Sequence, residues 1–135
     1  ILDLRSNGGG DPRPSSRLFS YLATTSQPYF RADAPGFYTG LKSNVPLSEP
    51  HYDGELYTLI DGLCFSTTGH FAALLKYQDI GTFIGTETGG SFVCTDNSAE
   101  FTLSRTGMRF QMSRTIWGFA LEGFTLGRGI APDIP

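Results

Sequence analysis

The feature that most restricts the fold is a strand that runs through a glycine turn directly into a helix. Residues 56–60 are apolar, aromatic or β-branched, as in a buried strand, and the run stops at Asp61-Gly62. Apolar residues then recur at helical spacing from 71 to 77, with Ser66 or Thr67 as the expected N-cap. This segment predicts a strand, a tight turn and a helix of about three turns.

The same order occurs at the start of the chain. Residues 1–5 are strand-like, residues 6–12 are rich in glycine, and residues 14–23 have the apolar spacing of a helix. A further strand is expected at 82–84, ending at Gly85. Alternating strands and helices predict an α/β fold with a parallel sheet and right-handed crossovers.

The remaining segments are less regular. Residues 24–54 contain four prolines and are expected to form extended segments and loops. Residues 100–103, 108–112 and 115–120 predict short antiparallel strands, with turns such as Thr106-Gly107 between them. The carboxyl-terminal part should therefore be antiparallel, unlike the first two thirds.

Composition excludes several classes of function. A chain of 135 residues suits one domain, and its net charge of −3 with scattered basic residues argues against a nucleic-acid surface or an anionic membrane surface. No apolar run reaches the roughly 18 residues that cross a bilayer. Cys64 and Cys94 lack the spacing of a zinc site; Cys64 is expected to be a buried free thiol, and a disulfide with Cys94 is the alternative.

Ser66 is the first candidate for chemistry. A serine where a strand turns into a helix lies near the positive end of the helix dipole, and the free N–H groups of the first turn can bind an oxyanion. The same serine can instead be a simple helix cap. Local sequence leaves both interpretations open.

Four separated segments resemble motifs of the S41 serine peptidases, the family of the C-terminal (tail-specific) processing proteases and the tricorn core proteases. They fall in the family's order and span nearly the whole chain. They are Asp3-Leu4-Arg5-Ser6-Asn7-Gly8-Gly9-Gly10, Gly62-Leu63-Cys64-Phe65-Ser66-Thr67-Thr68, Ile84-Gly85-Thr86-Glu87-Thr88-Gly89-Gly90 and Gly127-Arg128-Gly129-Ile130-Ala131-Pro132-Asp133. The resemblance implies a crotonase/ClpP-like core, of which residues 1–135 would be the C-terminal part.

The strand-like start at Ile1 also suggests truncation, because native chains rarely begin inside a core strand. We therefore expect an upstream half of the same protein as a partner. A bare first strand exposes a sheet edge, so pairing with another chain, including a homo-oligomer, is expected too.

The resemblance assigns roles to particular residues. Ser66 would be the nucleophile that forms an acyl-enzyme with a peptide or protein substrate, without a metal or organic cofactor. The backbone N–H groups of Thr67 and of Gly9 or Gly10 would hold the oxyanion. The family resemblance also suggests a periplasmic or extracytoplasmic location.

The general base is harder to assign. Processing proteases of the family use a lysine at the position of Ser91, whereas the tricorn-like branch uses an upstream histidine and a downstream glutamate. Glu122 is the candidate for that glutamate, and a solvated surface carboxylate is the alternative. His70 lies one helical turn after Ser66, but a packed or capping histidine is favoured.

Other polar and aromatic residues have plain structural interpretations. His51 is expected in a loop, and Glu87 is expected in loop structure, with substrate contact as the alternative. Asp3 and Arg5 predict an ion pair or hydrogen bonds near a strand end, and Trp117 predicts core packing.

Two further functions stay open beside the peptidase. The lysine missing at Ser91 motivates a non-catalytic peptide-binding or scaffolding domain. An acyl-group enzyme on a crotonase-like fold is the third candidate, although no feature specific for coenzyme A is evident. With its base upstream, the chain alone is expected to be inactive.

Overall fold

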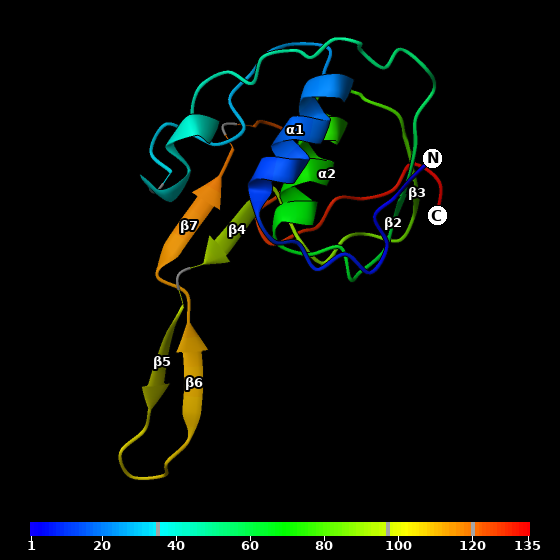
Figure 1. Ribbon diagram of the computed structural model, residues 1–135. Helices are drawn as coiled ribbons and strands as arrows, with labels where there is room; N and C mark the ends of the chain where they lie inside the picture. The colour runs from blue at the N-terminus through cyan, green and yellow to red at the C-terminus, as the bar shows by residue number, and fades with distance from the viewer. Residues whose placement is uncertain (35, 97, 120) are drawn as a thin grey trace.

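A computed structural model describes residues 1–34, 36–96, 98–119 and 121–135, and it divides the chain between a mixed α/β body and a projecting hairpin (Figure 1). In the body, β1 (Leu2–Asp3), β2 (Tyr57–Ile60) and β3 (Thr82–Gly85) form a sheet in the order β1-β2-β3. Both pairings are parallel, with Leu2 opposite Thr58 and Thr58 opposite Phe83. The parallel sheet expected from the two strand-turn-helix units is confirmed.

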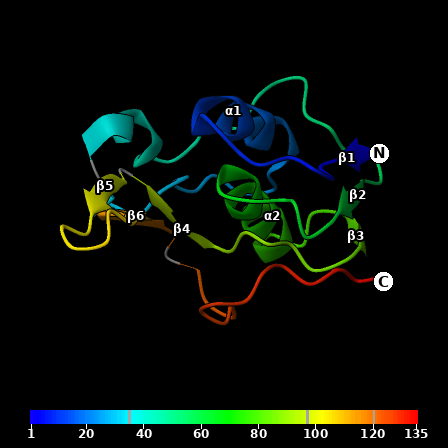
Figure 2. The same cartoon turned by 90° about the horizontal axis from the view of Figure 1, so that it is seen from below.

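Two helices build the rest of the body. α1 (Pro12–Leu22) begins two residues before the expected position, because the Asp11 carboxylate accepts a hydrogen bond from Arg13 N (2.9 Å) and proline is tolerated in the first helical turn. α2 (Thr67–Tyr77) has the bounds that the sequence predicts. α2 links β2 to β3 and packs against α1 (Figure 2).

α2 is the central element of the core. All residues from 67 to 75 are buried, so the helix has no wide polar face and must be covered on every side. An aromatic cluster packs beside it, where the Phe30 ring lies 5.8 Å from Phe119, 5.3 Å from Trp117 and 5.5 Å from His70 between ring centroids. Trp117 is core packing, as predicted, and His70 is a buried histidine within this cluster.

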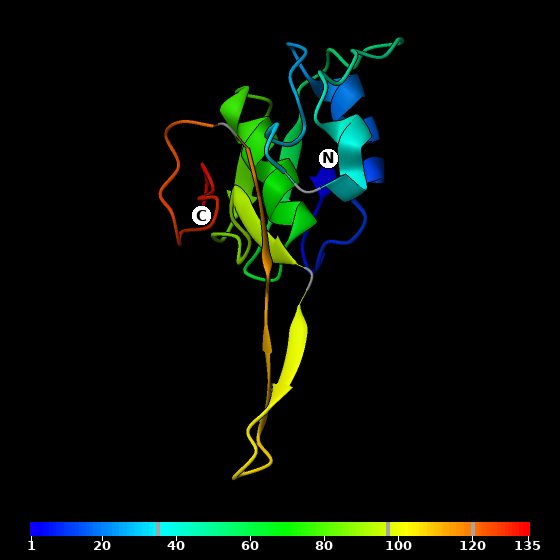
Figure 3. The same cartoon turned by 90° about the vertical axis from the view of Figure 1, so that its left-hand side faces the viewer.

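Two antiparallel strand pairs complete the fold. β4 (Val93–Asp96) pairs with β7 (Thr115–Gly118), and β5 (Ala99–Thr102) pairs with β6 (Arg109–Met112). The second pair projects away from the body (Figure 3). The sequence predicts β5, β6 and β7 to within two residues, but not β4, nor the 3-10 segment Gly36–Leu41.

The C-terminal segment closes the free edge of β3. Ile84 forms a parallel bridge with Ile134, and the Asp133 carboxylate accepts hydrogen bonds from Phe83 N (2.8 Å) and from Lys76 Nζ at the end of α2. The earlier part of this segment holds the loop after β3, since Ile130 N donates to Thr88 Oγ1 (2.8 Å). The final glycine-rich motif is therefore a structural clamp.

Gly129 is required for this clamp, because a Cβ there would lie 1.7 Å from Thr88 O. We expect Gly129→Ala to lower the free energy of unfolding by at least about 2 kcal/mol, since the chain must move away from the loop. Gly40→Ala is the matched control, because a Cβ at Gly40 meets nothing within 4 Å. Urea unfolding of the two variants measures the difference, and equal stabilities would contradict the clamp.

Candidate active site

Ser66 lies in a strained turn between β2 and α2. Its backbone angles are φ 52° and ψ −125°, a region that residues other than glycine rarely adopt, and its side chain makes no capping hydrogen bond to α2. A serine in such a turn, with its hydroxyl left free by the helix, is the geometry of a nucleophile elbow. Ser66 is the N-cap residue of α2 by position, as the sequence predicts, but its side chain does not cap the helix.

The glycine loop after β1 packs directly on this turn. A Cβ at Gly9, where φ is 93°, would come within 2.8 Å of both Ser66 Cβ and Thr67 N. Thr67 Oγ1 donates a hydrogen bond to Gly10 O (2.6 Å). The loop can approach the serine this closely only because residue 9 has no side chain.

Asn7 fastens the loop to the start of α2. Its side-chain oxygen accepts hydrogen bonds from Gly9 N (3.0 Å) and Thr68 Oγ1 (2.9 Å), while its backbone oxygen accepts from Phe65 N (3.0 Å). Two of these bonds, from Thr68 and Phe65, cross-link the two segments, and the third lies within the glycine loop. The N–H group of Gly9 is therefore already used in a hydrogen bond to Asn7.

Asp61 makes a second cross-link at the base of the turn. Its carboxylate accepts hydrogen bonds from Ser6 N (3.0 Å) and Leu63 N (3.0 Å). The bond from Ser6 N, followed by that from Leu63 N, holds the pKa of Asp61 below its ordinary value. The charged carboxylate therefore stabilises the relative position of the two loops.

The candidate oxyanion donors lie beside Ser66. Thr67 is the first residue of α2, so its N–H has no acceptor within the helix and lies at the positive end of the helix dipole. Gly10 and Thr67 line a small hollow together with Ser66. The structure therefore brings Ser66, Thr67, Gly9 and Gly10 into one place.

Cys94 lines the same hollow as Ser66 and contacts a buried histidine behind it. Cys94 Sγ lies 3.9 Å from His70 Nδ1, and His70 Nε2 lies 3.2 Å from Trp117 O. Because Nε2 faces a carbonyl oxygen, Nε2 carries the proton and Nδ1 is the acceptor. Cys94 comes from β4, the strand that sequence reasoning missed, and no local signal indicates its place beside Ser66.

Burial keeps both of these groups uncharged. Desolvation lowers the pKa of His70 to about 4. Desolvation, followed by the charge of Asp96, raises the pKa of the Cys94 thiol to about 11. At neutral pH the pair is therefore a neutral imidazole and a neutral thiol. Both cysteines are free, as the sequence favours for Cys64.

Several predicted residues lie outside this hollow. Glu122 is exposed and lines a pocket of about 520 Å³ with Lys76 and Tyr77, at the end of α2 opposite Ser66, so its catalytic role stays a prediction.

The other polar candidates lie in loops. The Glu87 carboxylate accepts a hydrogen bond from Gly129 N (2.8 Å) and forms an ion pair with Arg128, as expected for loop structure. His51 lies in the loop before β2. Ser91 Oγ, at the family's lysine position, is buried without a hydrogen-bond partner among the described residues.

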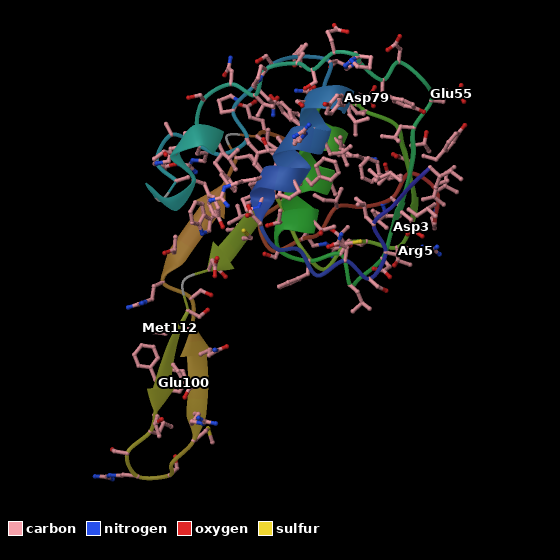
Figure 4. The ribbon with its side chains drawn as sticks, viewed as in Figure 1. Asp3, Arg5, Glu55, Asp79, Glu100 and Met112 are labelled. Atoms are coloured by element: carbon pink, nitrogen blue, oxygen red, sulfur yellow. The ribbon has the colours of Figure 1, made fainter. Side chains whose placement is uncertain are left out.

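The predicted contact between Asp3 and Arg5 is confirmed as an exposed ion pair (2.7 Å) at the end of β1, and the two side chains lie together in Figure 4. Both residues lie on the segment that leads into the glycine loop. Neither of them lines the hollow around Ser66.

A groove of about 390 Å³ adjoins the hollow of Ser66 and shares Gly10 and Thr67 with it. Its apolar walls include Leu4, Leu18 and Phe71. An extended chain lying across Gly10 could place an apolar side chain here. Within the described ranges no three His, Cys, Asp or Glu side chains cluster as metal ligands, and no described helix is long and apolar enough to span a membrane.

Comparison with known proteins gives one family. A profile of peptidase family S41 matches residues 1–135, and no curated protein matches the chain. The structure is similar to a photosystem II D1 C-terminal processing protease, with a TM-score of 0.60 and 18% identity over 98% of this chain and 33% of that chain. It is also similar to a lipoprotein from Streptococcus agalactiae, with a TM-score of 0.61 and 19% identity over 99% of this chain and 48% of that chain. This chain thus spans a third to a half of the length of these two proteins.

The approach of Gly9 to the serine turn gives a direct test. Gly9→Ala should lower the free energy of unfolding by about 2 kcal/mol or more, because a Cβ would clash with Phe65 O, Ser66 Cβ and Thr67 N and φ is positive. Gly8→Ala is the matched control, since a Cβ there meets nothing within 4 Å. Chemical denaturation compares the two, and a tolerated Gly9→Ala would mean that the loop does not rest on the turn.

Asp61 predicts a particular pH dependence. Because its pKa is lower in the folded than in the unfolded chain, its stabilising effect is present above the ordinary aspartate pKa and is lost as the pH falls through the folded value. Asp61→Asn should therefore be less stable than the wild type at neutral pH, with the difference shrinking below about pH 4. Thermal unfolding from neutral to acidic pH measures the difference, and a constant gap would refute this role of the charge.

Proposed function

Because the chain belongs to peptidase family S41, we propose that it carries the nucleophile of a serine endopeptidase, at Ser66. The proposal includes a crotonase-like core, of which residues 1–135 form the C-terminal part, with an upstream part of the same protein completing the site. The substrates are peptides or proteins. We also propose that the protein acts outside the cytoplasm, and this part of the proposal is based only on the family resemblance.

The observation that carries the proposal is the conformation of Ser66. A positive φ of 52° at a non-glycine residue costs free energy, and the free hydroxyl contributes nothing to capping α2. Strain of this kind persists where the surroundings impose it, and it accumulates at active sites. The tight contacts of Gly9 and the bonds of Asn7 and Asp61 supply such surroundings.

Two backbone N–H groups are proposed to hold the oxyanion. Thr67 N–H is supported by its place at the start of α2, where no intrahelical acceptor is available. Gly10 is the better second donor of the two glycines, because the N–H of Gly9 already donates to Asn7 Oδ1. Preorganised donors of this kind lower the barrier by stabilising the charge as it develops.

The reaction then proceeds in two halves. Ser66 Oγ attacks the carbonyl carbon of the scissile bond while its proton passes to the base, and the amine leaves with that proton as the acyl ester forms. Water next attacks the ester and gives its proton through the same base to Ser66, which releases the free acid.

The base is proposed to be a histidine from the upstream part, as in the tricorn-like branch that the sequence resembles. His70 is a poor base, because burial holds its pKa near 4 and its Nδ1 faces Cys94. Residues 1–135 alone are accordingly proposed to be inactive.

The second candidate is a peptide-binding or scaffolding domain without catalysis. The residue at the family's lysine position favours it, because Ser91 cannot act as that base and its hydroxyl is buried. The apolar groove beside Ser66 would still accept a peptide side chain. Peptide binding without cleavage, unchanged in Ser66→Ala, would favour this function.

Covalent labelling tests the nucleophile. In the longest natural chain that contains residues 1–135, a fluorophosphonate should modify Ser66, as read by mass spectrometry, and Ser66→Ala should lower peptide cleavage by at least about a thousandfold. Ser91→Ala is the control and should leave labelling intact. Cleavage that survives Ser66→Ala would rule out Ser66 as the nucleophile.

A further inference from the structure

The β5–β6 hairpin has two opposite faces of different chemistry. Side chains alternate along each strand, and residues directly opposite on an antiparallel pair lie on the same face. The pairs Ala99 with Met112 and Phe101 with Phe110 therefore share one face, and the Phe101 and Phe110 rings stack with their centroids 5.3 Å apart. Alternation adds Leu103 and Met108, whose backbones are joined by a hydrogen bond (2.9 Å).

The other face is polar. Glu100 and Thr102 alternate with the apolar residues of β5, and Arg109 and Gln111 with those of β6. An ion pair between Arg109 and Glu100 (3.2 Å) crosses this face. The hairpin is thus amphipathic along its full length, and Figure 4 shows Glu100 and Met112 on it, away from the body.

The apolar face is uncovered in the single chain. Its five large side chains, which are Phe101, Leu103, Met108, Phe110 and Met112, are between 39% and 61% exposed. A two-stranded hairpin is marginally stable alone, and contiguous apolar surface of this kind marks an interaction site. Something should cover this face in solution.

We propose that the apolar face of the β5–β6 hairpin is a dimerisation surface that packs on the same face of a second copy of this chain. The face carries no charge, so two copies can meet without bringing like charges together, and both polar faces stay in water. Covering both copies would remove on the order of 1,000 Å² from solvent, which is the size that a specific interface needs.

Symmetry favours an antiparallel arrangement of the two hairpins about a two-fold axis. The tip of the hairpin carries Arg105, and its base carries both Asp96 and Arg114, whose backbones are joined by a hydrogen bond (3.2 Å). A two-fold axis through the stacked rings places the polar tip of one copy beside the polar base of the other. A self-complementary patch of this type gives a closed dimer.

A lipid surface fits the hairpin less well. Residues 104–107 at the tip are Ser, Arg, Thr and Gly, so the tip is polar and the apolar residues lie along the sides of the strands. An open two-stranded sheet laid in lipid would also leave its edge N–H and C=O groups unsatisfied. The apolar face of a second hairpin has the same length and is flat, so it fits this surface better than lipid does.

The chain contains its own probes of this face. Its only two methionines, Met108 and Met112, both lie on it. Peroxide converts exposed methionine to the sulfoxide, so the oxidation rate reports on coverage. As protein concentration rises, sedimentation velocity should show the mass moving from one chain towards two, and the oxidation of both methionines should slow at least threefold over the same range.

Paired charge substitutions test whether the apolar face mediates dimerisation, and they do not depend on one residue that the fold itself could require. Met108→Lys with Met112→Lys should weaken dimerisation at least tenfold. Thr102→Lys with Gln111→Lys is the matched control, because it adds the same charge to the opposite face and should leave the dimer intact. Circular dichroism of both double variants checks that the body stays folded.

Three results would overturn the proposal. A chain that stays monomeric at every concentration has no such interface, whether or not its methionines are protected by another part of the protein. A dimer that the two double variants weaken equally forms through another surface. Binding to phosphatidylglycerol vesicles with no change of mass in solution would assign the face to lipid. None of these results bears on Ser66, so the proposed peptidase function stands or falls separately.

Discussion

The close contact between the glycine loop and the turn at Ser66 is the constraint on which the rest of the structure depends. Gly9 lies so near Ser66 and Thr67 that a single methyl group would not fit between them. The contact is made by backbone, so it brings N–H groups rather than side chains next to the serine. Anion binding by backbone requires this kind of approach.

Polar bonds maintain that contact from both sides. Asn7 and Asp61 link the glycine loop to the turn, and the C-terminal clamp holds the loop after β3 through Gly129 and Ile130. Gly90 N adds a bond to Cys64 O (2.8 Å), which joins the second loop to the same turn. The strain at Ser66 is supported because three segments, distant in sequence, each bond to the turn or to its neighbours.

The parts of the fold that were predictable have strong local signals. α2 has the predicted bounds because its apolar spacing starts and stops clearly, and the parallel sheet follows from two strand-turn-helix units. β4 was missed because Val93–Asp96 is short and mixes polar with apolar residues. Its partners in β7 lie between Thr115 and Gly118, on the far side of the whole β5–β6 hairpin, and local periodicity cannot report such a pairing.

The same division applies to the site. Ser66, Thr67 and the two glycines belong to contiguous motifs, so their types and spacing identify them as candidates. The neutral pair of Cys94 and His70, and the pocket that Glu122 shares with Lys76, depend on which elements meet in space. No short motif encodes either arrangement.

By itself, the sequence determined the peptidase family, the α/β class and the candidate nucleophile, because these depend on residue types at fixed local spacing. Only the tertiary structure decided that Ser66 is strained and leaves its side chain out of capping α2, that the N–H of Gly9 donates to Asn7, and that the hairpin has one exposed apolar face. Dihedral angles, hydrogen-bond partners and solvent exposure are set by packing between distant segments. They are properties of the assembled chain.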